Sequence, residues 1–235
     1  MANPLTTARN KYHQNIKDSS IYTPAGVCQF LFDILHPVFR KTIFNKMIVD
    51  PSIGSGNLVK PFSKAGYKIL GYDINDDSDR IKIEGFNQFN FLEETKKRDD
   101  VSFVICNPPF NTDKRNKDFL KKEKMGKALL PELFAEQAFY LYGRDIPLIL
   151  FSPMGILLNQ RMYDKDKDGR KVTKNKGERY RKMRDRFPEI TSIISLPLDV
   201  FSGVEFHNLV LMFNIPQLKP HYFLPEKYFE EEDFE

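Results

Sequence analysis

The chain has 235 residues, of which 41% are hydrophobic and 29% charged, which is typical of a globular domain with a substantial core. No apolar run approaches the roughly 20 residues that a membrane-spanning helix needs, and the N-terminus has no apolar signal segment. The two cysteines, Cys28 and Cys106, form neither a disulfide framework nor a zinc-ligand pattern. We therefore expect a cytoplasmic protein that has no membrane partner and binds no metal.

The net charge of +4 conceals an uneven distribution along the chain. Residues 161–186 contain twelve Lys and Arg against five acids, and residues 111–128 contain seven against three. The tail from Glu226 instead contains six acids and one lysine. Concentrated positive charge of this kind suits a polyanion such as DNA, although two solvated loops are an equally good interpretation of charge alone.

Composition and pattern predict a single domain with short flanking segments. Residues 1–20 are polar and are expected to form an N-terminal arm. The domain is expected over residues 21–225, with basic inserts at 111–128 and 159–186. Residues 226–235 would form an acidic tail.

The first predicted element is a helix that follows residue 23. Thr23 has the side chain of a helix cap, and Pro24 suits the first helical position. Pro37 is expected to end this helix. Apolar residues recur between them at helical spacing, namely Val27, Phe30, Leu31, Ile34 and Leu35.

A strand, a glycine loop and a second strand follow in sequence. Residues 47–49 are apolar and lead into Asp50, after which Gly54 and Gly56 permit a sharp turn close to a ligand. The next predicted strand ends at Asp73. An acid about 20 residues beyond a glycine loop is the ribose-hydroxyl acceptor of nucleotide-binding folds.

The most informative segment is Asn107-Pro108-Pro109-Phe110. It ends the apolar run 101–105, and its prolines stop the strand and stiffen the turn. A carboxamide held by such a turn can accept a hydrogen bond from an amino group, while the nearby ring can stack on a flat substrate. This combination predicts chemistry on the exocyclic amine of a planar group such as a nucleobase.

Strands and helices alternate over the rest of the chain, which predicts an α/β, doubly wound, mostly parallel sheet of Rossmann-like type. A C-terminal antiparallel strand is expected to close it. Polar residues at four strand ends (Asp50, Asp73, Asn107 and Ser152) would meet at one edge. The other expected elements are a helix from Leu58, a third strand near residues 86–93, a helix over 131–142, and strands over 147–151, 190–196 and 209–213.

In order and spacing, these motifs resemble the DNA adenine-N6 methyltransferases that use S-adenosylmethionine (SAM), of the class whose SAM motifs precede the catalytic one. The similarity extends from Tyr22 to about Phe213. Four segments carry it: Tyr22-Thr23-Pro24, Asp50-Pro51-x-x-Gly54-x-Gly56, Asp73 and Asn107-Pro108-Pro109-Phe110. The resemblance implies SAM as the cofactor, no metal, and a methyltransferase that acts on DNA, as in restriction–modification systems.

The resemblance also implies roles for individual residues. Asn107, Pro108 and Phe110 would be catalytic, and Phe110 together with Phe206 of the loop 201–208 would hold a flipped-out base. Phe206 is also an ordinary candidate for the core. The residues expected to bind the cofactor are Tyr22, Thr23, Asp50, Ser52, Gly54, Gly56, Asp73, Asn90, Phe91 and Asn107.

Two features depart from the family. The family often carries an aspartate where Asn90 stands, and members commonly have a C-terminal recognition domain, whereas about 20 residues follow Phe213 here. We therefore expect the basic inserts to bind DNA, alone or with a separate recognition subunit or in a homodimer. The expected contacts are Lys114, Arg115, Arg161, Arg170, Lys171, Lys174, Arg179 and Arg181.

Two other functions remain open on the sequence. The chain could methylate another planar amine or amide, such as an RNA adenine or a protein glutamine. It could also be a non-catalytic subunit that binds SAM or DNA for a catalytic partner, although the intact segment 107–110 argues against this.

Overall fold

The computed structural model describes most of the expected domain. The described residues are 23–42, 45–76, 81–109, 130–154, 168, 186–198, 200–201 and 208–229, with the backbone of 163–165 and 171–173. The N-terminal arm, the first basic insert and the tail beyond residue 229 lie outside them. Within the described ranges, no helix is both long and apolar enough to cross a membrane.

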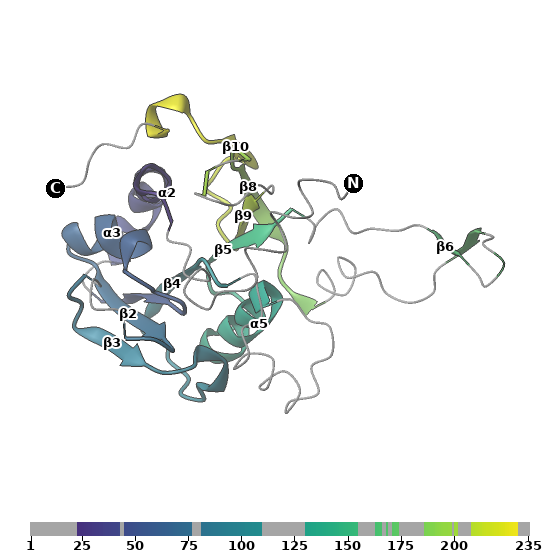
Figure 1. The fold of residues 1–235 in the computed structure, drawn as a ribbon. Helices are drawn as coiled ribbons and strands as arrows, with labels where there is room; N and C mark the ends of the chain where they lie inside the picture. The colour runs from purple at the N-terminus through teal and green to yellow at the C-terminus, as the bar shows by residue number, and fades with distance from the viewer. Residues whose placement is uncertain are drawn as a thin grey trace, which may run out of the picture.

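An eight-stranded sheet with the order β10-β8-β9-β5-β4-β1-β2-β3 forms the centre of the fold (Figure 1). β9 runs antiparallel to both of its neighbours, β5 and β8, and all the other neighbours pair in parallel. This arrangement confirms the predicted α/β class with its C-terminal antiparallel strand. The strands are β1 (Met47–Asp50), β2 (Lys68–Asp73), β3 (Gly85–Gln88), β4 (Val101–Cys106), β5 (Leu148–Pro153), β8 (Ile190–Ser195), β9 (Asn208–Phe213) and β10 (His221–Phe223).

Two hydrophobic cores lie on opposite faces of this sheet because successive side chains of a strand point to opposite sides. In β4, Phe103 and Ile105 belong to the core beneath α2 and α3, whereas Val104 and Cys106 belong to the core beneath α5. Figure 1 shows α2 and α3 on one side of the sheet and α5 on the other. The helices are α2 (Ala25–Phe39), α3 (Lys60–Lys64) and α5 (Leu130–Tyr142).

The first helix differs from the prediction at both ends. Pro24, not Thr23, occupies the cap position, and no side chain caps the helix. Pro37 lies inside α2, which continues to Phe39 and then into a 3₁₀ turn over Arg40–Thr42. A proline in the last turns forfeits one backbone hydrogen bond. Beyond Pro37, the Phe39 ring packs on the Phe103 ring with centroids 4.6 Å apart, and this contact holds the end of the helix in the core.

Several other elements were not predicted. A 3₁₀ helix, Asn57–Val59, precedes the short α3 where one helix was expected from residue 58. Within the second basic insert, β6 (Tyr163–Lys165) and β7 (Lys171–Thr173) form a two-stranded antiparallel sheet. β10 adds a further parallel strand beside β8. These three strands are only three residues long, too short for a readable hydrophobic period.

The segment after β10 packs onto α2 near the N-terminus of that helix. Here a 3₁₀ turn, Glu226–Tyr228, places the Tyr228 ring 5.1 Å from the Phe30 ring. The Tyr228 hydroxyl donates a hydrogen bond of 2.6 Å to Asp33. A Cβ atom on Gly26 would lie 1.9 Å from the Tyr228 carbonyl oxygen. The packed 3₁₀ turn 226–228 therefore requires a glycine at position 26 of α2.

We expect Gly26→Ala to lower the free energy of unfolding by about 1–3 kcal/mol, because the added methyl group overlaps backbone atoms of the packed turn. This loss outweighs the better helix propensity of alanine, about 1 kcal/mol. Urea unfolding followed by circular dichroism measures the effect. Gln29→Ala, at an exposed position one turn further along α2, is the control and should change stability by less than about 0.5 kcal/mol. A Gly26→Ala variant as stable as the wild type would contradict this account of the contact.

Candidate active site

The sheet has a topological switch point between β1 and β4. From β1 the chain first builds β2 and β3 on one side, and then returns to place β4 and β5 on the other. In such sheets ligands bind outside the carboxyl ends of the strands at this point. Asp50 ends β1, Asp73 ends β2, and Asn107 follows β4. The structure thus brings three of the predicted site residues to the same edge.

The loop after β1 depends on its glycines. Gly54 and Gly56 have positive φ angles of 51° and 86°, which residues with side chains rarely adopt. A Cβ atom on Gly56 would also lie 2.4 Å from the side chain of Ile81, whose N–H donates to the Ser55 carbonyl at 2.9 Å. The loop is therefore compact, with its backbone close to the strand ends.

The Asp73 side chain forms hydrogen bonds that hold this loop at the end of β2. One carboxylate oxygen accepts the N–H of Gly54 at 2.9 Å, and the other accepts the N–H of Asn75 at 2.8 Å. Since a carboxylate has about four acceptor positions, two backbone bonds fix its orientation and leave capacity for a ligand hydroxyl. The predicted ribose contact of Asp73 is compatible with this geometry and stays a prediction.

Asp50 is buried, with 1% of its surface exposed. One carboxylate oxygen accepts the N–H of Ser52 at 3.1 Å, while the other has no hydrogen-bond partner among the described residues. Burial, with a smaller contribution from the nearby Asp73 carboxylate, raises the pKa of Asp50 to about 8 against the lowering effect of the Ser52 N–H. An unpaired buried acceptor of this kind indicates a place for a cationic or hydrogen-bond-donating ligand group.

Asn107 is hydrogen-bonded to Thr23, which belongs to the first motif of the chain. Its side-chain Nδ2 donates a hydrogen bond of 3.1 Å to Oγ1 of Thr23, which is 84 residues away in the chain. Thr23 is buried, with 4% of its surface exposed, and Asn107 is half-buried. The threonine that was predicted to cap α2 therefore bonds to the predicted catalytic carboxamide instead.

Asn90 and Phe91 occupy the neighbouring turn beyond β3. The Asn90 side chain accepts the N–H of Leu92 at 3.2 Å, donates to Glu93 at 3.1 Å, and so caps the 3₁₀ turn Phe91–Glu93. The Phe91 ring is 1% exposed and stacks on Phe134 with centroids 5.9 Å apart. Phe91 and Phe134 are therefore core residues, and the predicted cofactor contact of Phe91 would involve its backbone.

Other polar side chains near this edge have local roles. The Ser52 hydroxyl lies 3.6 Å from the Cys106 sulfur, which links the glycine loop to β4, and burial raises the pKa of the Cys106 thiol. Ser55, which the sequence did not single out, has a buried hydroxyl without a partner among the described residues. Ser152 is the second-last residue of β5, as expected near the end of this strand; it is fully buried, and its hydroxyl donates to the Pro153 carbonyl at 3.3 Å.

Many of the predicted contact residues lie outside the described ranges. Lys171 is described only by its backbone, in β7. The predicted residues outside the described ranges are Tyr22, Phe110, Lys114, Arg115, Arg161, Arg170, Lys174, Arg179, Arg181 and Phe206. In the part of the chain that the structure covers, no three His, Cys, Asp or Glu side chains gather as metal ligands.

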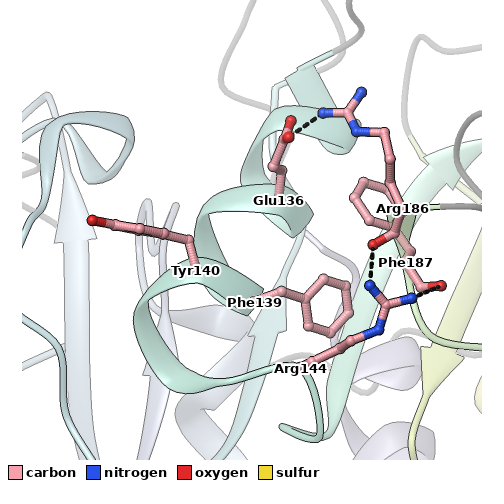
Figure 2. Close-up of a pocket in the computed structure, with 6 residues that line it drawn as sticks. All are labelled: Glu136, Phe139, Tyr140, Arg144, Arg186 and Phe187. Atoms are coloured by element: carbon pink, nitrogen blue, oxygen red, sulfur yellow. Dashed lines mark hydrogen bonds and ion pairs between the residues drawn. The ribbon is translucent and has the colours of Figure 1, made fainter.

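A surface hollow beside α5 is a separate feature (Figure 2). Arg144 donates to the carbonyls of Arg186 and Phe187 at 2.8 and 3.1 Å, and Arg186 pairs with Glu136. Arg144 precedes β5 and Arg186 precedes β8, so the hollow lies toward the amino ends of these strands. Its arginines bind groups of the protein itself, and it takes no part in the site described above.

Comparison with models of known protein families finds no match, and comparison with curated protein sequences finds none either. Several solved structures are similar in fold. One is assigned as a class I SAM-dependent methyltransferase from Listeria monocytogenes; it is 19% identical, with a TM-score of 0.57, over 93% of this chain and 70% of that protein.

Two others are a subunit of a restriction–modification system and a restriction endonuclease. The methyltransferase subunit of a type I system from Streptococcus thermophilus is 18% identical over 86% of this chain, with a TM-score of 0.58. The type IIG restriction endonuclease BpuSI is 16% identical over 88% of this chain, with a TM-score of 0.57. This chain spans 47% and 27% of those proteins. The likenesses show that the chain has the class I SAM-dependent methyltransferase fold.

Proposed function

We propose that this chain, which has the class I methyltransferase fold, transfers a methyl group from SAM to the N6 amine of a flipped-out adenine in DNA. The observation that carries the proposal is the carboxamide of Asn107, held at the carboxyl end of β4 by the Thr23 hydroxyl at 3.1 Å. It presents an acceptor at the switch point, where ligands of such sheets bind.

The residues supply the groups that this reaction needs. An adenine amine is a poor nucleophile because its lone pair is delocalised into the ring. Oδ1 of Asn107 and the carbonyl oxygen of Pro108 would accept its two N–H groups and favour a pyramidal nitrogen. Positioning and electrostatics then provide most of the acceleration. No strong general base is required, since the methylated ammonium would be very acidic. Phe110 would stack on one face of the base and Phe206 on the other.

The described residues fit SAM, which supplies the transferable methyl group on its sulfonium centre. The unpaired, buried oxygen of Asp50 offers an acceptor for a cationic group such as an α-ammonium. The positive φ angles of Gly54 and Gly56 allow close approach of the loop backbone to a ligand. Asp73 retains acceptor capacity for ribose hydroxyls beyond its bond to the Gly54 N–H.

DNA is the favoured substrate on two grounds. Of the structurally similar proteins, one is the methyltransferase subunit of a type I restriction–modification system and another is a type IIG restriction endonuclease, by their own descriptions. The inserts 111–128 and 159–186 carry a strong excess of positive charge and follow β4 and β5 in the chain. Because the target base must leave the duplex to reach such a site, backbone contacts are needed to hold the opened DNA.

The proposal is tested by methyl transfer with the purified chain. Incubation with methyl-tritiated SAM and DNA should label the DNA, and enzymatic digestion with chromatography should recover the label as N6-methyldeoxyadenosine. RNA and protein mixtures are assayed in parallel. Label found in RNA adenine or protein glutamine would replace DNA as the substrate, and no label in any of them would favour a non-catalytic subunit.

A second measurement concerns the DNA-binding role of the insert. Replacing residues 164–178 by a short Gly/Ser linker is expected to weaken DNA binding strongly while sparing SAM affinity. Each lost phosphate contact should lower the slope of log affinity against log salt by about 0.9. Fluorescence anisotropy with labelled DNA at several salt concentrations measures both. Unchanged affinity and salt dependence would assign recognition to a separate subunit or to another surface.

A further inference from the structure

The carboxamide of an asparagine has two chemically opposite ends. Its oxygen accepts hydrogen bonds and its nitrogen donates them, and a half-turn about the terminal side-chain torsion exchanges the two. Only one of these orientations of Asn107 can accept a hydrogen bond from a substrate amine. The other would place two donors against each other. Something in the protein must therefore select the orientation before the substrate arrives.

In the structure, the nitrogen end of this carboxamide is bound by Thr23. Nδ2 of Asn107 donates to Oγ1 of Thr23 at 3.1 Å. Across the described part of the chain, the carboxamide makes no other hydrogen bond. The donor end is thus bound to the protein, and no described residue donates a hydrogen bond to Oδ1, the acceptor end.

Thr23 is rigidly placed for this task. Its side chain is almost fully buried, and its carbonyl accepts the Cys28 thiol at 3.6 Å. The next carbonyl, that of Pro24, accepts the Cys28 N–H at 3.0 Å as the first hydrogen bond of α2. The same helix turn is held at Gly26 against Tyr228. The hydroxyl therefore has a fixed position relative to the end of β4.

We propose that Thr23 is a positioning residue whose hydroxyl, by accepting from Nδ2 of Asn107, holds the carboxamide in the orientation that presents Oδ1 to the amine of the methyl acceptor. This role rests on the proposed function and deepens it. It also couples the first motif of the chain to the catalytic turn through a side chain, independently of any contact that residue 23 makes with SAM.

The first test compares Thr23→Val with Thr23→Ser. Valine keeps the shape and removes the acceptor, whereas serine keeps the hydroxyl. At saturating SAM and DNA, the single-turnover rate should fall roughly three- to tenfold in Thr23→Val, as expected for one hydrogen bond, and recover in Thr23→Ser. SAM affinity, measured by calorimetry, should change by less than about twofold. Rate and affinity falling in equal proportion in Thr23→Val would overturn the proposal.

Thr191→Val is the matched control. Its hydroxyl also bonds within the protein, to the Met212 carbonyl at 3.2 Å, but it lies on β8 away from the switch point. It should leave the single-turnover rate of the folded enzyme unchanged. A loss equal to that of Thr23→Val would mean that both variants act through general stability.

A double-mutant cycle with Asn107→Asp provides a sharper test. A carboxylate has two equivalent oxygens, so it has no orientation to select. Thr23→Val should therefore lower the rate in the Asn107 enzyme but have little further effect in the Asn107→Asp enzyme. Equal losses in both backgrounds would show that the hydroxyl does not act through the orientation of residue 107.

The third measurement does not depend on activity. In nitrogen-15-labelled protein, Asn107→Asp identifies the side-chain NH₂ signals of Asn107 by their loss. Exchange of these protons with solvent should be slow in the wild type and in Thr23→Ser, and faster in Thr23→Val. If the wild type methylates nothing, the proposed function fails while this experiment still decides the contact. Equal exchange rates in all three proteins would disprove it.

Discussion

Asn107→Ala is expected to reduce the turnover number for methyl transfer by at least about a hundredfold. The substitution removes the acceptor aimed at the reacting amine, an interaction that strengthens as the nitrogen becomes pyramidal. It leaves the buried oxygen of Asp50 and the loop bonds of Asp73 in place. SAM affinity should therefore remain within about threefold of the wild type. Steady-state kinetics with tritiated SAM, together with calorimetry, separates the two effects.

The control for this experiment is Asn45→Ala. Asn45 is exposed and precedes β1, so it lies at the opposite edge of the sheet from the switch point. Its replacement should leave both turnover and SAM affinity unchanged. Near-normal turnover by Asn107→Ala would rule out the proposed role of the carboxamide. A parallel loss of SAM affinity would instead assign Asn107 mainly to the cofactor.

The second large effect is expected from Asp50→Asn, as a change in the pH dependence of stability. Burial raises the pKa of Asp50 from 3.8 to about 8 in the folded protein. Below pH 3.8 the carboxyl is protonated in both states. As the pH rises from there to about 8, the unfolded chain loses the proton while the folded protein keeps it, so folding becomes progressively less favourable. The neutral amide of the Asp50→Asn variant has no such dependence.

At pH 8–9 the free energy of unfolding of the ligand-free Asp50→Asn variant should thus exceed that of the wild type by on the order of a few kcal/mol. Urea unfolding at about pH 5, 7 and 9 measures the difference. Asp99→Asn, at an exposed position, is the control. The stability of the wild type, relative to that of Asp50→Asn, should decrease as the pH rises from about 5 to about 8. If it does not, the carboxyl of Asp50 is not buried in its protonated form.

The same variant should bind SAM more weakly, because a carboxylate paired with a cation is stronger than a neutral amide. In the wild type near neutral pH, pairing with a cationic ligand group should ionise Asp50 and release a proton. Calorimetry in buffers of different ionisation enthalpy detects that proton, which Asp50→Asn should not release. Identical proton release from both proteins would show that Asp50 does not receive the cationic group.

Local sequence predicted the elements that carry long, unambiguous patterns. The apolar runs of β1, β2, β4 and β5, and the 3.6-residue spacing in α5, appear where they were expected. These patterns encode burial directly, since a strand covered on both faces must be apolar throughout. The short strand β10 carries no such pattern: Phe223 is 74% exposed, and the strand is held by its pairing with β8.

By itself, the sequence determined the fold class and brought Asp50, Asp73 and Asn107 to one edge, because strand ends, glycines and prolines act through local backbone geometry. Tertiary structure decided what each side chain does there. Thr23 has the local signature of a helix cap, yet its hydroxyl bonds to a residue 84 positions away. Asp50 is an ordinary acid in the sequence and has a raised pKa in the fold. Partners and burial depend on packing between distant segments, and no local pattern records them.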